Sequence, residues 1–117
     1  MENPIFSTHG LFCVKRYAEA KSLLRKTVPV ARRVLGEGDS ITLRMRNCYA
    51  SSLVMTNGAT LGDLRESVTT LEDTERIARR VLGGAHPLTV NIEGCLRNMR
   101  ALSARETEAR RAAPGSQ

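Results

Sequence analysis

The sequence predicts an all-α fold, a short α-solenoid of antiparallel helix pairs, and three observations lead to this prediction. Apolar residues recur at three- and four-residue steps through most of the chain, which is the spacing of one helix face rather than of a strand. Aromatic residues are scarce, with two Phe, two Tyr and no Trp among 117 residues, whereas sheets draw heavily on aromatic and β-branched residues. The hexapeptide ARRVLG occurs at 31–36 and returns at 78–83, an offset of 47 residues (78 − 31). A repeat of that length holding two helices is typical of an α-solenoid.

The first strong helical pattern covers residues 17–35. Gly36 follows it and is expected to end the helix in the left-handed conformation. Pro29 lies inside the pattern, lacks a backbone donor and crowds the carbonyl four residues earlier, so we expect the helix to bend there. Residues 1–16 carry only a short apolar signal, and we expect them to form a partial helix and turn of a truncated first repeat.

A second helix is expected to begin at Asp39 or Ser40, because either side chain can accept hydrogen bonds from the free N–H groups of the first turn. It should end before Asn57-Gly58, which is a turn signal. The residues that we expect to face inward on this helix are Ile41, Met45, Cys48, Tyr49, Ser52 and Leu53.

Two further helices complete the pattern. Thr60 and Asp63 have the spacing of a capping box that opens the third helix, which should end at Gly83-Gly84. Pro87 suits the first turn of a fourth helix, where its missing N–H costs nothing. The sequence turns polar after residue 102, so we expect helical repeats over 17–102 and a frayed polar tail over 103–117.

The repeat extends beyond the hexapeptide. The same offset pairs identical residues at several places and apolar with apolar residues at others. The identical pairs outside the hexapeptide include Glu19/Glu66, Leu24/Leu71, Thr27/Thr74, Thr42/Thr89 and Cys48/Cys95.

The stretch K-R-Y-A-E-A at 15–20, followed by a helix ending in V-L-G, resembles the tetratricopeptide repeat, in particular the longer repeats of the kinesin light chain type. The second junction, with Gly83, His86 and Pro87, matches the G-x-x-H-P junction of that family. Ala50 stands at the small residue where the two helices of a pair touch. The equivalent position in the last helix is Arg97, a departure that leads us to expect no partner helix on that face.

Composition narrows the class of protein. No run of about 18 apolar residues is present, so no membrane span is expected, and the N-terminal residues lack the pattern of a secretory signal. Three widely spaced cysteines predict reduced thiols and a cytoplasmic location rather than a disulfide scaffold. The two histidines have no cysteine or histidine at a ligand spacing, and we expect neither a metal nor a cofactor.

The motifs predict an interaction module rather than an enzyme. No phosphate loop, nucleophile elbow or zinc-protease motif occurs. The resemblance implies that the first helix of each pair lines a concave groove for a peptide or a partner helix. Arg44, Asn47 and Ser51 share one helix face and are the expected groove residues, because an amide can bond an extended backbone and a guanidinium can pair with a carboxylate. Asn91, Glu93 and Asn98 are expected to extend that surface.

Two other interpretations of the sequence remain open. The chain carries 18 basic and 12 acidic residues, a net charge of +6, and arginine supplies 15 of the 18, which suits nucleic-acid binding. Against it, the arginines are interleaved with acids and stacking aromatics are scarce, so nucleic acid is the weaker alternative. A stack of about two and a half helix pairs is also short for a solenoid, which suggests a fragment of a longer repeat array. This interpretation predicts either marginal stability alone or self-association through the exposed apolar end of the solenoid.

Overall fold

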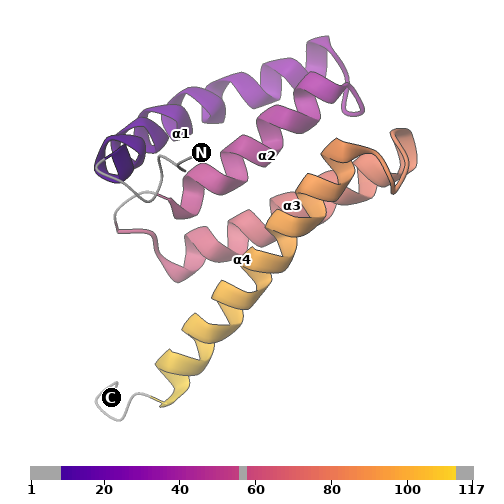
Figure 1. Cartoon of the computed structure of the whole chain (residues 1–117). Coiled ribbons are helices and arrows are strands. Elements are labelled where there is room, and N and C mark those ends of the chain that lie inside the picture. Colours follow the sequence, from indigo (N-terminus) through magenta and orange to yellow (C-terminus); the bar gives the residue numbers. More distant parts are fainter. Residues whose placement is uncertain (1–8, 56–57, 113–117) are drawn as a thin grey trace.

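A computed structural model describes the backbone of residues 9–55 and 58–112, and the side chains from residue 17 onward in these ranges. All of the regular structure in these ranges is helical: α1 (His9–Val34), α2 (Ser40–Val54), α3 (Leu61–Val81) and α4 (Pro87–Ala112). Each helix packs on the next along the chain, α1 on α2, α2 on α3 and α3 on α4, and α2 also touches α4 (Figure 1). The predicted all-α fold, a short array of antiparallel helix pairs, is confirmed.

The two copies of ARRVLG end their helices in the same way. Gly36 has φ +102° and Gly83 has φ +94°, so both adopt the left-handed conformation that glycine tolerates best. The Gly36 N–H donates to the Ala31 carbonyl at 3.2 Å, and the Gly83 N–H donates to the Ala78 carbonyl at 3.2 Å. The predicted glycine stops are therefore confirmed. α1 continues through Pro29 as one helix, and the bend expected there stays a prediction.

The predicted helix starts are confirmed as well. Asp39 caps α2 by accepting a hydrogen bond from the Ile41 N–H at 2.8 Å. Thr60 and Asp63 form the reciprocal capping box of α3, at 3.1 and 2.9 Å. The chain turns into α4 through a cap that the sequence reasoning missed, in which His86 Nδ1 accepts from the N–H two residues later at 3.0 Å.

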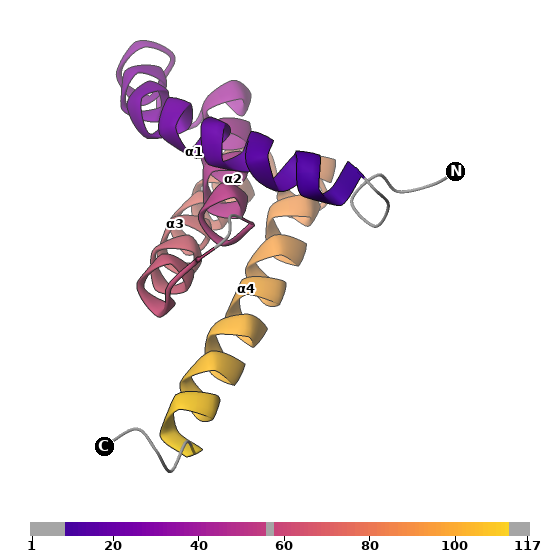
Figure 2. The same cartoon turned by 90° about the vertical axis from the view of Figure 1, so that its left-hand side faces the viewer.

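The predicted boundaries at 16/17 and 102/103 both fall inside helices. α1 begins at His9 and has no break at residue 17, and residues 1–8 lie outside the described part. α4 continues to Ala112, so residues 103–112 are helical where a frayed tail was expected. They are rich in Ala, Arg and Glu, which favour helix, and Arg110 pairs with Glu106 one turn earlier. This part of α4 extends beyond the other helices (Figure 2).

The inward face of α2 differs from the prediction. Ile41 and Cys48 are exposed, and Met45 and Tyr49 are half-buried. The prediction assumed one apolar face, but α2 contacts three helices, so its buried arc also takes polar residues that find partners. The buried residues of α2 are Thr42, Leu43, Arg46, Ala50, Ser52 and Leu53.

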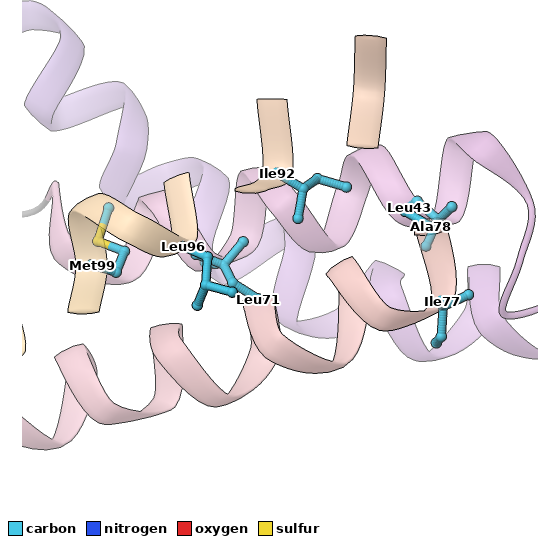
Figure 3. Close-up of a cluster of buried hydrophobic side chains, with 8 residues drawn as sticks. Leu43, Leu71, Ile77, Ala78, Ile92, Leu96 and Met99 are labelled. Atoms are coloured by element: carbon cyan, nitrogen blue, oxygen red, sulfur yellow. The ribbon is translucent and has the colours of Figure 1, made fainter. Parts of the chain in front are cut away.

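The core lies between α2, α3 and α4. Side chains from all three helices meet there (Figure 3). α1 covers the outer side of α2 with Val28 and Ala31, which are both buried. The core cluster consists of Leu43, Ala50, Leu71, Ile77, Ala78, Ile92, Leu96 and Met99.

Candidate interaction site

The predicted groove residues lie on the side of α2 that approaches α4. Asn47 Nδ2 donates a hydrogen bond to Asn91 Oδ1 at 3.1 Å, so the amides of two helices that are not neighbours in the sequence touch directly. Cys95 lies beside them, with its thiol 3.7 Å from Asn91 Oδ1. We call the surface formed by Arg44, Asn47 and Ser51 with Asn91 and Cys95 the α2–α4 face.

The three predicted residues are not equivalent on this face. Arg44 is exposed, whereas Asn47 and Ser51 are half-buried against α4. Burial raises the pKa of the Cys95 thiol, and hydrogen bonds with the side chains of Asn47 and Ser51 partly oppose that shift. The amide and the hydroxyl therefore already serve the contact between the helices, and the guanidinium is the group most available to a partner.

The three residues of α4 that were expected to extend the surface do not all lie on the α2–α4 face. Asn91 lies on the α2–α4 face and Asn98 is exposed. Glu93 instead turns toward α3, where it pairs with Arg79. Cys48, which the sequence predicted to face inward, is exposed. It lies near its repeat counterpart Cys95, and besides burial it helps to raise the pKa of that thiol.

A cleft on the opposite side of α2 was not predicted. It lies between α1, α2 and α3 and has a volume of about 260 Å³. At one end the Tyr49 hydroxyl accepts hydrogen bonds from the Arg25 guanidinium at 3.2 and 3.3 Å and donates one to Glu66 at 2.7 Å. Burial, with the Glu66 hydrogen bond, raises the pKa of Tyr49. These polar groups satisfy one another, which suits a structural contact between three helices.

The same cleft contains a buried cation. Arg46 is almost fully enclosed and pairs with Asp73 at 2.8 Å, and its second terminal nitrogen lies 3.5 Å from Glu37. Glu37 also pairs with Arg32 at 2.8 Å. The Arg46 hydrogen bond holds the pKa of Asp73 below its usual value. These charges join α1, α2 and α3, so we interpret the cluster as part of the scaffold.

The acidic side chains of α3 are paired with arginines at the surface. Glu75 pairs with Arg79 at 2.8 Å, one turn along the helix, and Asp73 pairs with Arg76. Glu72 reaches across to Arg100 on α4 at 3.0 Å.

Comparison with known families finds a match for one segment of the chain. Residues 11–40 match the tetratricopeptide repeat family. This confirms the resemblance to repeats of the kinesin light chain type over α1, the turn after it and the cap of α2. No curated protein and no solved structure matches the chain.

The described residues contain no group of three or more His, Cys, Asp or Glu side chains placed to hold a metal ion. Among the helices described, none combines the length and the apolar character that crossing a membrane requires. Tetratricopeptide repeats generally mediate binding between proteins and are typically non-catalytic.

Proposed function

We propose that this chain is a non-catalytic interaction scaffold that binds a peptide or a partner helix along the α2–α4 face. The observation that carries the proposal is the Asn47–Asn91 hydrogen bond, because it joins the two helices into one polar strip. Exposed Arg44 lies at the edge of that strip and has no ion-pair partner among the described residues. It would supply a charge-assisted hydrogen bond to a carboxylate of the partner.

Asn47 and Ser51 have a supporting role in this proposal. The Asn47 oxygen is buried and accepts no hydrogen bond in the described structure, and a buried unpaired acceptor costs free energy. A small rotation of either amide upon binding would let a partner's backbone N–H reach it. The partner would be an extended peptide, or a helix with a polar face and an acidic group.

The test uses the full chain and a peptide enriched on it from a random peptide display library, with binding measured by fluorescence anisotropy. The triple variant Arg44→Ala, Asn47→Ala and Ser51→Ala should raise Kd at least about tenfold, since each lost hydrogen bond to a charged group is worth about 1.5–3 kcal/mol. Arg65→Ala, an exposed arginine on α3, is the matched control and should leave Kd unchanged. Equal Kd for the triple variant and the wild type, with both folded, would overturn the site.

The ion pairs weigh against the nucleic-acid alternative. Six arginines are paired with acids: Arg32, Arg46, Arg76, Arg79, Arg100 and Arg110. The number of basic side chains free to contact phosphates is therefore smaller than the 18 basic residues of the sequence suggest. A salt titration separates the two functions, because nucleic-acid binding weakens steeply with salt and peptide binding much less. We also propose a cytoplasmic location, for which free Cys48 and Cys95 are the support.

A further inference from the structure

Because the repeat has an offset of 47 residues, each helix at an end of the molecule can be compared with a helix in its middle. α1 corresponds to α3, and α4 corresponds to α2. In the middle, α2 and α3 form a complete helix pair. At the ends, α1 has no helix in the place that α2 takes on α3, and α4 has no helix in the place that α3 takes on α2, within the described residues.

The exposed fractions of equivalent apolar side chains differ accordingly. Ile77 of α3 is 7% exposed, whereas its counterpart in α1, Val30, is 44% exposed. Leu43 of α2 is fully buried, whereas its counterpart in α4, Val90, is 52% exposed. Leu43 of α2 and Ile77 of α3 belong to the same core cluster, to which α4 also contributes. Val90 and Val30 occupy the same two positions of the repeat, and they are exposed at opposite ends of the described helix array.

The charges at the ends are inverted together. The pair that joins α2 to α3 is Arg46 with Asp73 at 2.8 Å. Forty-seven residues later the position of Arg46 holds Glu93, and forty-seven residues earlier the position of Asp73 holds Lys26. In the middle of the molecule, α2 carries the basic residue and α3 the acidic one. At the ends, α4 carries the acidic residue and α1 the basic one. Such a double change preserves the attraction only if these two ends meet each other.

We propose that copies of this chain associate head to tail, with α4 of one copy packed on α1 of the next in the arrangement of α2 on α3. Val90 would cover Val30 of the next copy, and Glu93 would pair with its Lys26. Glu93 already pairs with Arg79, but Arg46 likewise has a neighbour on each side, Glu37 and Asp73. The occupant of each open end is a second copy of this chain.

Charge argues against the symmetric alternative, in which two α1 faces meet. Over residues 17–34, α1 has five basic side chains and one acidic side chain, Glu19, so two such faces would repel each other. A head-to-tail contact leaves one α1 and one α4 free at the ends of any open assembly. Association of this heterologous kind continues along a chain of copies unless it closes into a ring.

The contact should be weaker than the one it imitates. Ala50 is fully buried, and its carbonyl accepts a hydrogen bond from Ser67 at 2.9 Å, which requires close approach of α2 and α3. Arg97 takes the place of Ala50 in α4 and holds the helices further apart. In α1 of the next copy, Ala20 takes the place of Ser67, and Glu19 beside it supplies a carboxylate for Arg97. We therefore expect reversible association rather than an obligate assembly.

The experiment is sedimentation velocity on the full chain over roughly a hundredfold range of concentration. The wild type should show a weight-average mass that rises above 12.9 kDa with concentration. Lys26→Glu should raise the dissociation constant at least about tenfold by placing two carboxylates opposite each other. Arg33→Glu is the matched control: it makes the same charge change on α1, and Arg33 and its counterpart Arg80 are both exposed. It should leave the association unchanged.

Mixing provides the decisive arm. Alone, Lys26→Glu and Glu93→Lys should each associate at least about tenfold more weakly than the wild type. An equimolar mixture should associate again, because every contact between the two kinds of copy joins opposite charges. Circular dichroism establishes that both variants are folded. If Glu93→Lys is not folded, Val30→Glu is tested alone as a second disrupting variant, because two variants that both change α1 cannot restore each other in a mixture. A constant mass for the wild type, equal effects of Lys26→Glu and Arg33→Glu, or a folded mixture that stays monomeric would each overturn the proposal.

Discussion

Arg46 is the residue on which the contacts between helices depend most. It is buried, and its guanidinium holds Asp73 of α3 and approaches Glu37 of the turn between α1 and α2. Removing one partner of a buried pair leaves the other charge without compensation, which costs about 3–5 kcal/mol. We expect Arg46→Gln to lower the free energy of unfolding by about 2 kcal/mol, less than that range because Asp73 is partly open to solvent. Urea unfolding measures it.

The pH dependence of the same variant provides the control. The pKa of Asp73 is lowered, first by its hydrogen bond with Arg46. A lowered carboxyl pKa adds stability that is present above the unfolded value and disappears as the pH falls through the folded one. The cost of Arg46→Gln should therefore shrink as the pH drops below about 4. Arg76→Gln, which removes the exposed partner of Asp73, should cost only about 0.5 kcal/mol at neutral pH. Equal costs for the two variants would contradict the special place of Arg46.

At the scale of the element, the glycines of the repeat and of α4 should respond in opposite directions. Gly83 ends α3 with φ +94°, where a side chain is strained, so Gly83→Ala should lower the free energy of unfolding by about 1 kcal/mol. Gly94 lies inside α4, and a Cβ added there would meet nothing within 4 Å. Gly94→Ala should therefore raise the stability by about 0.5–1 kcal/mol. Thermal and urea unfolding of both variants test the difference, and a shared sign would contradict the assignment.

The elements also show how far sequence reasoning reaches. Helix ends were predictable, because a capping box such as Thr60–Asp63 and a glycine such as Gly36 act through the local backbone. The inward face of α2 was not, because three neighbouring helices decide which side is buried and Arg46 is buried through a partner 27 residues away. The groove prediction depended on the same tertiary information: spacing put Arg44, Asn47 and Ser51 on one face, but only the packing of α4 shows that two of them already contact it.

At the scale of the whole molecule, stability should decrease from the middle toward the ends. In a linear array each helix is stabilised by its neighbours alone, so α2 and α3, with a helix on each side, should open last. α1 has α2 on one side only, and the end of α4 extends past the other helices (Figure 2). Hydrogen exchange read by mass spectrometry should thus show the lowest protection in α1 and in residues 103–112.

The same measurement connects stability with assembly. If copies join head to tail, raising the protein concentration should protect the amides of α1 and of the first half of α4, while α2 and α3 keep their rates. Lys26→Glu should abolish this dependence on concentration, and Arg33→Glu should preserve it. Val54, the last residue of α2, has its repeat counterpart at Ala101 of α4. Residues 103–112 therefore lie beyond the part of α4 that corresponds to α2, and their exchange rates serve as an internal reference. Uniform protection along the chain would contradict the linear picture, and protection of residues 103–112 alone would locate the contact at the wrong end of α4.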